Sequence, residues 1–180
     1  MIPTTEICFE MMDKYGMLDN IKAHSIVVEK VASRIGIGLR EAEIDISLEK
    51  ISAGALMHDI GKTLCLNTHD DHALRGSEIC IHNNFREIAE IVGEHIRLKD
   101  FDMENPTNEK EIIYYSDKRV NHDVVVSLEE RLIYLLERYA GDREDLKGLI
   151  KENFLQCKEV EKKIFSSLDF GPEELAELIL

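Results

Sequence analysis

Apolar residues recur every three or four positions along most of the chain, which is the spacing of helices that bury one face. No stretch shows the alternation of apolar and polar residues that predicts a half-buried β-strand. The pattern therefore predicts an all-α chain. The expected helices cover about residues 5–15, from 19 to 36, from 45 or 47 to 58, 72–81, 85–96, from 108 through 117, 127–139 and 142–168, followed by a short C-terminal helix.

Residues that start and stop helices divide this pattern. Asp19 is a good N-cap, Ser127 begins a capping-box sequence, and Gly36 is expected to end its helix. The polar segments 63–71 and 99–107 are expected to be loops. The first of them directly follows the sequence HDIGK at residues 58–62.

A chain of 180 residues has the length of one domain. We expect a single domain over residues 1–180, with a core at about 19–140 and a helical extension at about 142–180. The apolar face of the extension has two explanations: it pairs two chains in a homodimer, or it packs within the chain as a hairpin.

Composition narrows the class of protein. Hydrophobic residues make up 44% and charged residues 32%, which is typical of a folded globular protein and not of a disordered one. No apolar run reaches the roughly 20 residues of a membrane span. The N-terminal residues lack a signal-peptide pattern, and the four cysteines form no CxxC pair, so we expect reduced thiols in the cytoplasm. A net charge of −14 disfavours a nucleic-acid polymer as partner.

The candidate chemistry centres on the sequence His58-Asp59-Ile60-Gly61-Lys62, which ends an apolar run. A neutral imidazole and a carboxylate are good ligands for divalent transition metals, and burying both without a cation is costly. His24 lies upstream and Asp117 downstream, each on its own predicted helix.

A His, His-Asp, Asp series closed by HDIGK resembles the HD superfamily of metal-dependent phosphohydrolases over about residues 24–138. The resemblance implies a single HD-type helical bundle with the metal between central helices. The first metal site that it implies consists of His24, His58, Asp59 and Asp117. Asp123 is a rival to Asp117 because it follows the same predicted helix; Asp117 is preferred because the apolar and aromatic residues before it place it in a half-buried run.

A second metal site is implied by the branch of the superfamily with two metals. His72 opens an HxxxG element and His95 ends another segment that carries a ligand in that branch, and Asp59 would bridge the two ions. This pattern is similar to bacterial hydrolases of symmetrical dinucleoside polyphosphates. The chain departs from the cyclic-dinucleotide phosphodiesterases, because Ile96 replaces the second residue of their His-His pair and their Gly-Tyr-Pro signature is absent. His72 could instead cap its helix, pack or bind phosphate, and His69 is its rival.

Catalytic roles are expected for Asp59, Lys62 and Arg75. Lys62 follows the His-Asp pair closely enough to reach a metal-bound phosphate, although a solvated lysine is an equal alternative. Arg75 could offer a bidentate fork to a phosphate or form a salt bridge with Asp71 or Glu78. Arg97 and Lys118 are weaker candidates of the same kind, Asp70 and Asp71 could orient an imidazole from outside the site, and His82 and His122 are expected to be solvated.

The resemblance implies hydrolysis of a nucleotide or related small phosphate ester or anhydride, by attack of metal-activated water on phosphorus. The expected cofactor is one or two divalent ions of Fe, Mn, Co, Ni, Zn or Mg, and the expected partner is a small phosphorylated substrate. Two alternatives stay open: a metal-containing regulatory module that binds nucleotide without turnover, and a binuclear-iron oxygenase.

Overall fold

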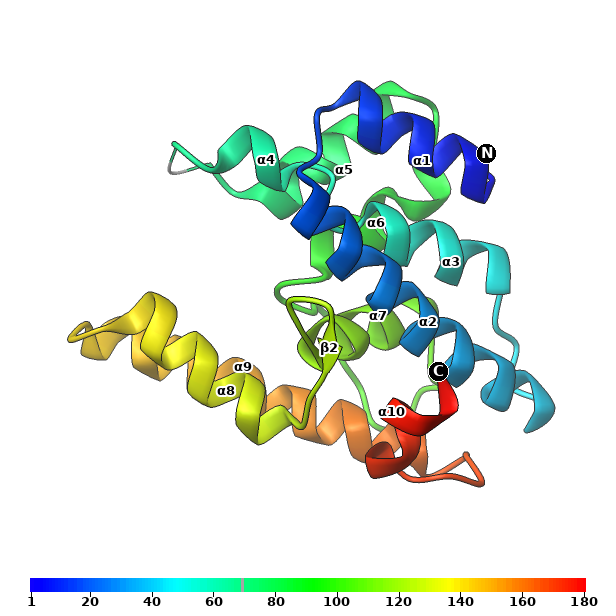
Figure 1. Ribbon diagram of the computed structural model, residues 1–180. Coiled ribbons are helices and arrows are strands. Elements are labelled where there is room, and N and C mark those ends of the chain that lie inside the picture. Colours follow the sequence, from blue (N-terminus) through cyan, green and yellow to red (C-terminus); the bar gives the residue numbers. More distant parts are fainter. Residues whose placement is uncertain (69) are drawn as a thin grey trace.

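Helices carry most of the described chain, residues 1–68 and 70–180 of the computed structural model, so the all-α prediction is confirmed (Figure 1). In that part of the chain the only β-structure is a two-stranded antiparallel hairpin. The elements are α1 Thr5–Lys14, α2 Asp19–Glu41, α3 Leu48–Met57, α4 Lys62–Cys65, α5 His72–His82, α6 Arg86–Glu94, α7 Glu109–Lys118, β1 Val120–Asn121, β2 Val124–Val125, α8 Leu128–Leu135, a π-helical turn Leu136–Ala140, α9 Glu144–Phe165, a 3-10 turn Pro172–Glu174 and α10 Leu175–Leu178.

Helix α3 lies at the centre of the bundle and packs against α1, α2, α6 and α7. Its small and apolar side chains are buried on every side, which is why its sequence reads as a continuous hydrophobic run instead of a stripe. Ser47 accepts a hydrogen bond from the backbone of Lys50 and caps the helix, as one of the two predicted starts requires. The helix ends where His58 and Asp59 begin, so the central element of the core delivers the motif.

Helix α2 is longer than its sequence predicts, and the prediction that it ends at Gly36 is wrong. The glycines in its second half serve close packing. A Cβ on Gly36 would lie 2.5 Å from Ile51 Cδ1, and one on Gly38 would lie 2.7 Å from Leu168 Cδ2. The start also differs from the prediction, because Asp19 lies inside the first turn and the capping position belongs to Leu18.

The hydrophobic pattern does not predict two short elements. Residues 62–65, which overlap the start of the predicted loop 63–71, form the single turn α4, and residues 120–125 form the β1–β2 hairpin. Each strand has two residues, which is too short to produce a visible alternation. The turn between the strands contains His122 with φ of 55°, a left-handed conformation that is uncommon for a residue with a side chain.

The C-terminal helices form a hairpin that reaches beyond the bundle (Figure 1). Ser127 opens α8 with the predicted capping box, and α9 returns to pack against α8 and α7. Buried polar contacts join α9 to α7: the hydroxyl of Tyr114 donates to the carbonyl of Asn153 at 2.7 Å, and Lys163 Nζ lies 2.7 Å from Glu111 Oε1. This packing within the chain accounts for much of the apolar face of the extension, while the homodimer stays a prediction. Within the described residues, no helix is both long and apolar enough to cross a membrane.

The Lys163–Glu111 pair gives a direct test of how the extension is held. Both side chains are almost fully buried, and Lys163 also donates to the carbonyl of Asp102 at 2.7 Å. Lys163→Met leaves Glu111 buried without its cation, so the free energy of unfolding should fall by about 3 kcal/mol. The neighbouring Lys162→Met should change it by less than about 0.5 kcal/mol, because Lys162 is exposed. Urea denaturation followed by circular dichroism measures both, and equal effects would contradict the assignment.

Candidate metal centre

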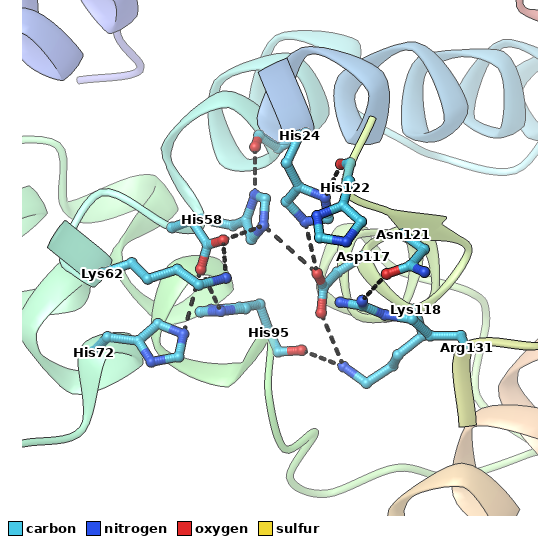
Figure 2. A network of polar contacts seen from close by, with 12 residues as sticks. His24, His58, Lys62, His72, His95, Asp117, Lys118, Asn121, His122 and Arg131 are labelled. Atoms are coloured by element: carbon cyan, nitrogen blue, oxygen red, sulfur yellow. Dashed lines mark hydrogen bonds and ion pairs between the residues drawn. The ribbon is translucent and has the colours of Figure 1, made fainter. Parts of the chain in front are cut away.

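Four imidazoles and two carboxylates converge on one point in the middle of the bundle (Figure 2). They come from five helices or helix ends, and the first and last are 93 residues apart. The structure thus brings together all six residues that the sequence nominates as metal ligands. They are His24 on α2, His58 and Asp59 after α3, His72 at the start of α5, His95 after α6 and Asp117 on α7.

Asp59 lies between two groups of ligands. Its Oδ1 is 3.3 Å from His72 Nε2 and 3.5 Å from His95 Nε2, while its Oδ2 is 3.5 Å from His58 Nε2. Asp117 completes the other side, with Oδ1 at 3.1 Å from His24 Nε2 and 3.7 Å from His58 Nε2. Two clusters that share Asp59 therefore have donor atoms close enough to surround an ion each.

Backbone carbonyl groups set the orientation of three of the rings. The Nδ1 atoms of His24, His58 and His95 each lie 2.7 Å from a carbonyl oxygen. The three oxygens belong to His122, Ala55 and Val92 in that order. Because a carbonyl only accepts, each Nδ1 carries the hydrogen, and in the neutral ring the lone pair of Nε2 points into the cluster.

Acceptors thus face acceptors at the centre of the site. His58 is fully buried, and its Nε2 has no hydrogen-bond partner among the described residues. Burial lowers the pKa of His58 from 6.5 to about 3, against the opposing pull of Asp59, so the ring is neutral near pH 7. A buried lone pair beside carboxylate oxygens is costly unless a cation lies between them. The donor set of imidazole nitrogens and carboxylate oxygens fits a divalent transition metal.

Two lysines border the carboxylates. Lys62 Nζ lies 2.7 Å from Asp59 Oδ2, and Lys118 Nζ lies 3.4 Å from Asp117 Oδ2. Burial pushes the pKa of Asp59 upward, but the Lys62 ammonium opposes this effect, and the pKa lies well below its usual range. Lys118 also donates to the carbonyl of His95 at 2.6 Å and is almost fully buried, so it joins α7 to the end of α6 and is not free to grip a substrate phosphate.

Close backbone contact brings α5 to the cluster. A Cβ on Gly61 would lie 2.4 Å from the carbonyl oxygen of His72 and 2.8 Å from the nitrogen of Gly76. The φ of Gly61 is −81°, so the position needs a glycine for space and not for conformation. Asp71 caps α5 by accepting from the backbone of Ala73 at 2.9 Å, which leaves the imidazole of His72 free to face Asp59.

A cavity of about 520 Å³ opens onto the cluster. One end exposes Asp59, His72, His95 and Asp117, and the other is formed by the α8–α9 hairpin. This volume lies in the range of sites that enclose a drug-sized ligand, so there is room for more than a phosphate group. The segment after α3 also borders this cavity, since Lys62, Leu66 and Asp70 line it.

Several other candidates lie elsewhere. Arg75, expected at a phosphate, is exposed and pairs with Glu78 at 3.0 Å, because its turn of α5 faces away from the cavity. Asp123 is exposed in the hairpin turn, so Asp117 is the carboxylate that faces the histidines. His69 lies outside the described residues. The side chains of His82 and His122 are exposed, as expected, although the carbonyl group of His122 orients His24.

Sequence reasoning missed the residues that the α8–α9 hairpin contributes to the cavity. Arg131, Leu135 and Tyr139 recur every fourth position and line it from one side. The sequence predicts a helix at 127–139, but nothing local to that segment indicates that one of its faces meets a site made by residues 24–117.

The chain matches one family model and is similar over part of its length to several known proteins. A model of the HD domain matches residues 21–121. A tRNA (cytidine(56)-2'-O)-methyltransferase of Picrophilus torridus is 29% identical over 153 residues, which cover 77% of this chain and 41% of that protein. A Ribonuclease Y of Thermosipho melanesiensis is 37% identical over 82 residues, 45% of this chain and 15% of that protein, and one of Fusobacterium nucleatum is 41% identical over 64 residues, 36% of this chain and 11% of that protein. The chain thus spans less than half the length of these relatives, and no solved structure matches it.

The tight contact at Gly61 predicts a specific defect. Gly61→Ala should push α5 away, lower the free energy of unfolding by about 1–3 kcal/mol, and weaken metal binding at the His72 side of the cluster. Gly148→Ala on α9 is the control, since its Cβ meets nothing within 4 Å and alanine favours an exposed helix by about 0.5–1 kcal/mol. Denaturation and metal titration measure both variants. Wild-type behaviour of Gly61→Ala would contradict the role given to this contact.

The neutral state of His58 predicts a pH dependence for the metal-free protein. The unfolded chain binds a proton near pH 6.5 and the folded chain only near pH 3, so acidification through this window favours unfolding. His58 alone should contribute a slope of up to about 1.4 kcal/mol per pH unit. His58→Gln should flatten the decline between pH 6.5 and 4.5, whereas the exposed control His82→Gln should not. Urea denaturation of chelator-treated protein at several pH values measures these slopes, and a slope unchanged in His58→Gln would sink the assignment.

Proposed function

The chain belongs to the HD domain family, and on that premise we propose that it is a metal-dependent phosphohydrolase acting on a nucleotide or a related small phosphate ester or anhydride. The observation that supports this most is the arrangement around Asp59, where three imidazole nitrogens lie within 3.5 Å of the carboxylate oxygens and the buried Nε2 of His58 has no hydrogen-bond partner among the described residues. An arrangement of this kind suits a divalent ion, and the adjoining cavity suits a substrate of nucleotide size.

Two groups of ligands sharing a carboxylate favour two ions, held by His24, His58, Asp59 and Asp117 on one side and by Asp59, His72 and His95 on the other. When bound, such ions polarise a phosphoryl oxygen and lower the pKa of water. Fe, Mn, Co, Ni and Zn all accept this donor set, and Mg is the least suited because it prefers oxygen ligands.

The protein groups around the site have distinct tasks. Asp59 lies within 3.5 Å of three imidazoles, so its two oxygens are placed to serve both groups of ligands. Lys62 lies at the cavity wall with its ammonium beside Asp59, where it can stabilise negative charge that develops on a phosphoryl group. The side chains of the α8–α9 hairpin form the wall of the cavity opposite these groups.

A second candidate is cleavage of an RNA phosphodiester, which the similarity to proteins named Ribonuclease Y favours. The net charge of −14 opposes it, because a strand of RNA needs cations along its backbone. A short 5′-phosphorylated oligoribonucleotide belongs in the substrate panel for this reason. The regulatory and oxygenase alternatives would instead give nucleotide binding without phosphate release, or oxygen uptake with iron.

Metal reloading tests the proposal. Protein stripped with a chelator should regain phosphate release from a panel of nucleotides, dinucleoside polyphosphates and the oligoribonucleotide only after addition of Mn²⁺, Fe²⁺, Co²⁺, Ni²⁺, Zn²⁺ or Mg²⁺. His58→Ala and Asp59→Ala should lose bound metal and turnover by at least a hundredfold with little loss of helicity, because both residues belong to the central ligand set. Elemental analysis should give fewer ions in His95→Ala, and the exposed control His82→Ala should match wild type. Wild-type turnover in the Asp59 variant would refute the site.

A further inference from the structure

We propose that one face of the segment from α8 into the π-helical turn recognises the substrate: Arg131 binds its phosphate, and Leu135 with Tyr139 holds a nucleoside attached to that phosphate. This inference rests on the proposed function and adds a recognition surface to it. The three residues line the same cavity as the metal ligands and lie four positions apart, so they share one helical face.

Arg131 is a half-buried cation without an anion. Its Nε is shielded from solvent and has no hydrogen-bond partner, and no carboxylate within the described residues lies within 4 Å of its guanidinium. One terminal nitrogen donates to Asn121 Oδ1 at 3.0 Å, which holds the group on the Asp117 side of the cluster (Figure 2). In a chain with 36 acidic residues, a shielded guanidinium that lacks a carboxylate is poised for an anion from outside.

The other cations near the cavity are less suited to this task. Lys62 is engaged by Asp59, Lys118 by Asp117 and a backbone carbonyl, and Arg75 by Glu78 outside the cavity. Arg97 lines the cavity but is exposed, so water satisfies its donors. Arg131 therefore combines a free donor, partial desolvation and a position beside the metal ligands.

The same face supplies an apolar surface next to Arg131. Tyr139 is 56% exposed although it lines the cavity, and Leu149 from α9 is 46% exposed on the facing wall. Apolar side chains that border a polar centre and are still open to solvent gain stability when a planar, weakly polar group covers them. Tyr139 belongs to a π-helical turn, a distortion that is common at functional sites. A base attached through ribose to the bound phosphate is a group of that kind.

A binding experiment separates the two parts of this surface. Protein loaded with Mn²⁺ is titrated calorimetrically with inorganic phosphate, with the non-hydrolysable phosphonate analogue of AMP, and with a 5′-phosphorylated diribonucleotide. Arg131→Gln should weaken all three by about tenfold or more, because it removes charge-assisted hydrogen bonds to phosphate. Tyr139→Ala should weaken the two nucleoside ligands by several-fold and leave phosphate unchanged. If the diribonucleotide binds more tightly than the AMP analogue, the phosphate and nucleoside that the surface recognises belong to the end of an RNA. If the AMP analogue binds more tightly, they belong to a free nucleotide.

Arg138→Gln is the matched control, since it removes the same charge from the π-helical turn at an exposed residue that does not line the cavity. Arg131→Lys keeps the charge and should recover part of the phosphate affinity, which a purely structural role would not predict. Unchanged binding in Arg131→Gln, or equal losses in Arg138→Gln, would overturn the proposal while leaving the phosphohydrolase intact. Wild-type protein that binds metal but none of the three ligands would overturn both.

Discussion

The structure depends on a buried set of lone pairs that require a cation. Five helices end or begin so that their imidazole nitrogens and carboxylate oxygens meet, although these groups repel one another in the absence of positive charge. The apolar core that surrounds them has to hold this arrangement. Helix α3, buried against four neighbours, carries the central pair His58-Asp59, and the glycine contact after it brings α5 within reach. The packed core therefore holds these groups together against their mutual repulsion, and a bound cation would remove that repulsion.

Charge is distributed unevenly to serve the same centre. The chain as a whole carries a net charge of −14, yet Lys62, Lys118 and Arg131 line the cavity around two carboxylates. Two of these cations hold the carboxylates in place, and the third lacks an anionic partner. With divalent ions bound, the cavity would be a positive region in an acidic protein.

Much of the centre is predictable because its residues are chemically distinctive and stand at informative positions. The resemblance to the HD superfamily, carried by a His, His-Asp, Asp series closed by HDIGK, implies the six candidate ligands, and the structure brings all of them together. Arg75 was nominated by its one-turn distance from His72, but distance along a helix does not determine which face meets a cavity. Arg131 could not be found, since its position depends on how a hairpin folds back over residues distant in sequence. Gly36 misled the helix boundary because a glycine that permits close packing looks like one that ends a helix.

The three carbonyl contacts to His24, His58 and His95 have a consequence for how this protein tolerates change. The orienting groups belong to the main chain of Ala55, Val92 and His122, so the identity of those side chains has no part in aiming the rings. A substitution at one of these positions would act through packing and not through the orientation of the ring, since Ala55 and Val92 are buried in the core, whereas a single insertion or deletion beside any of them would rotate a ligand away. The information that aims the rings is thus carried by spacing along the chain instead of by residue type, and it is preserved as long as segment lengths are preserved.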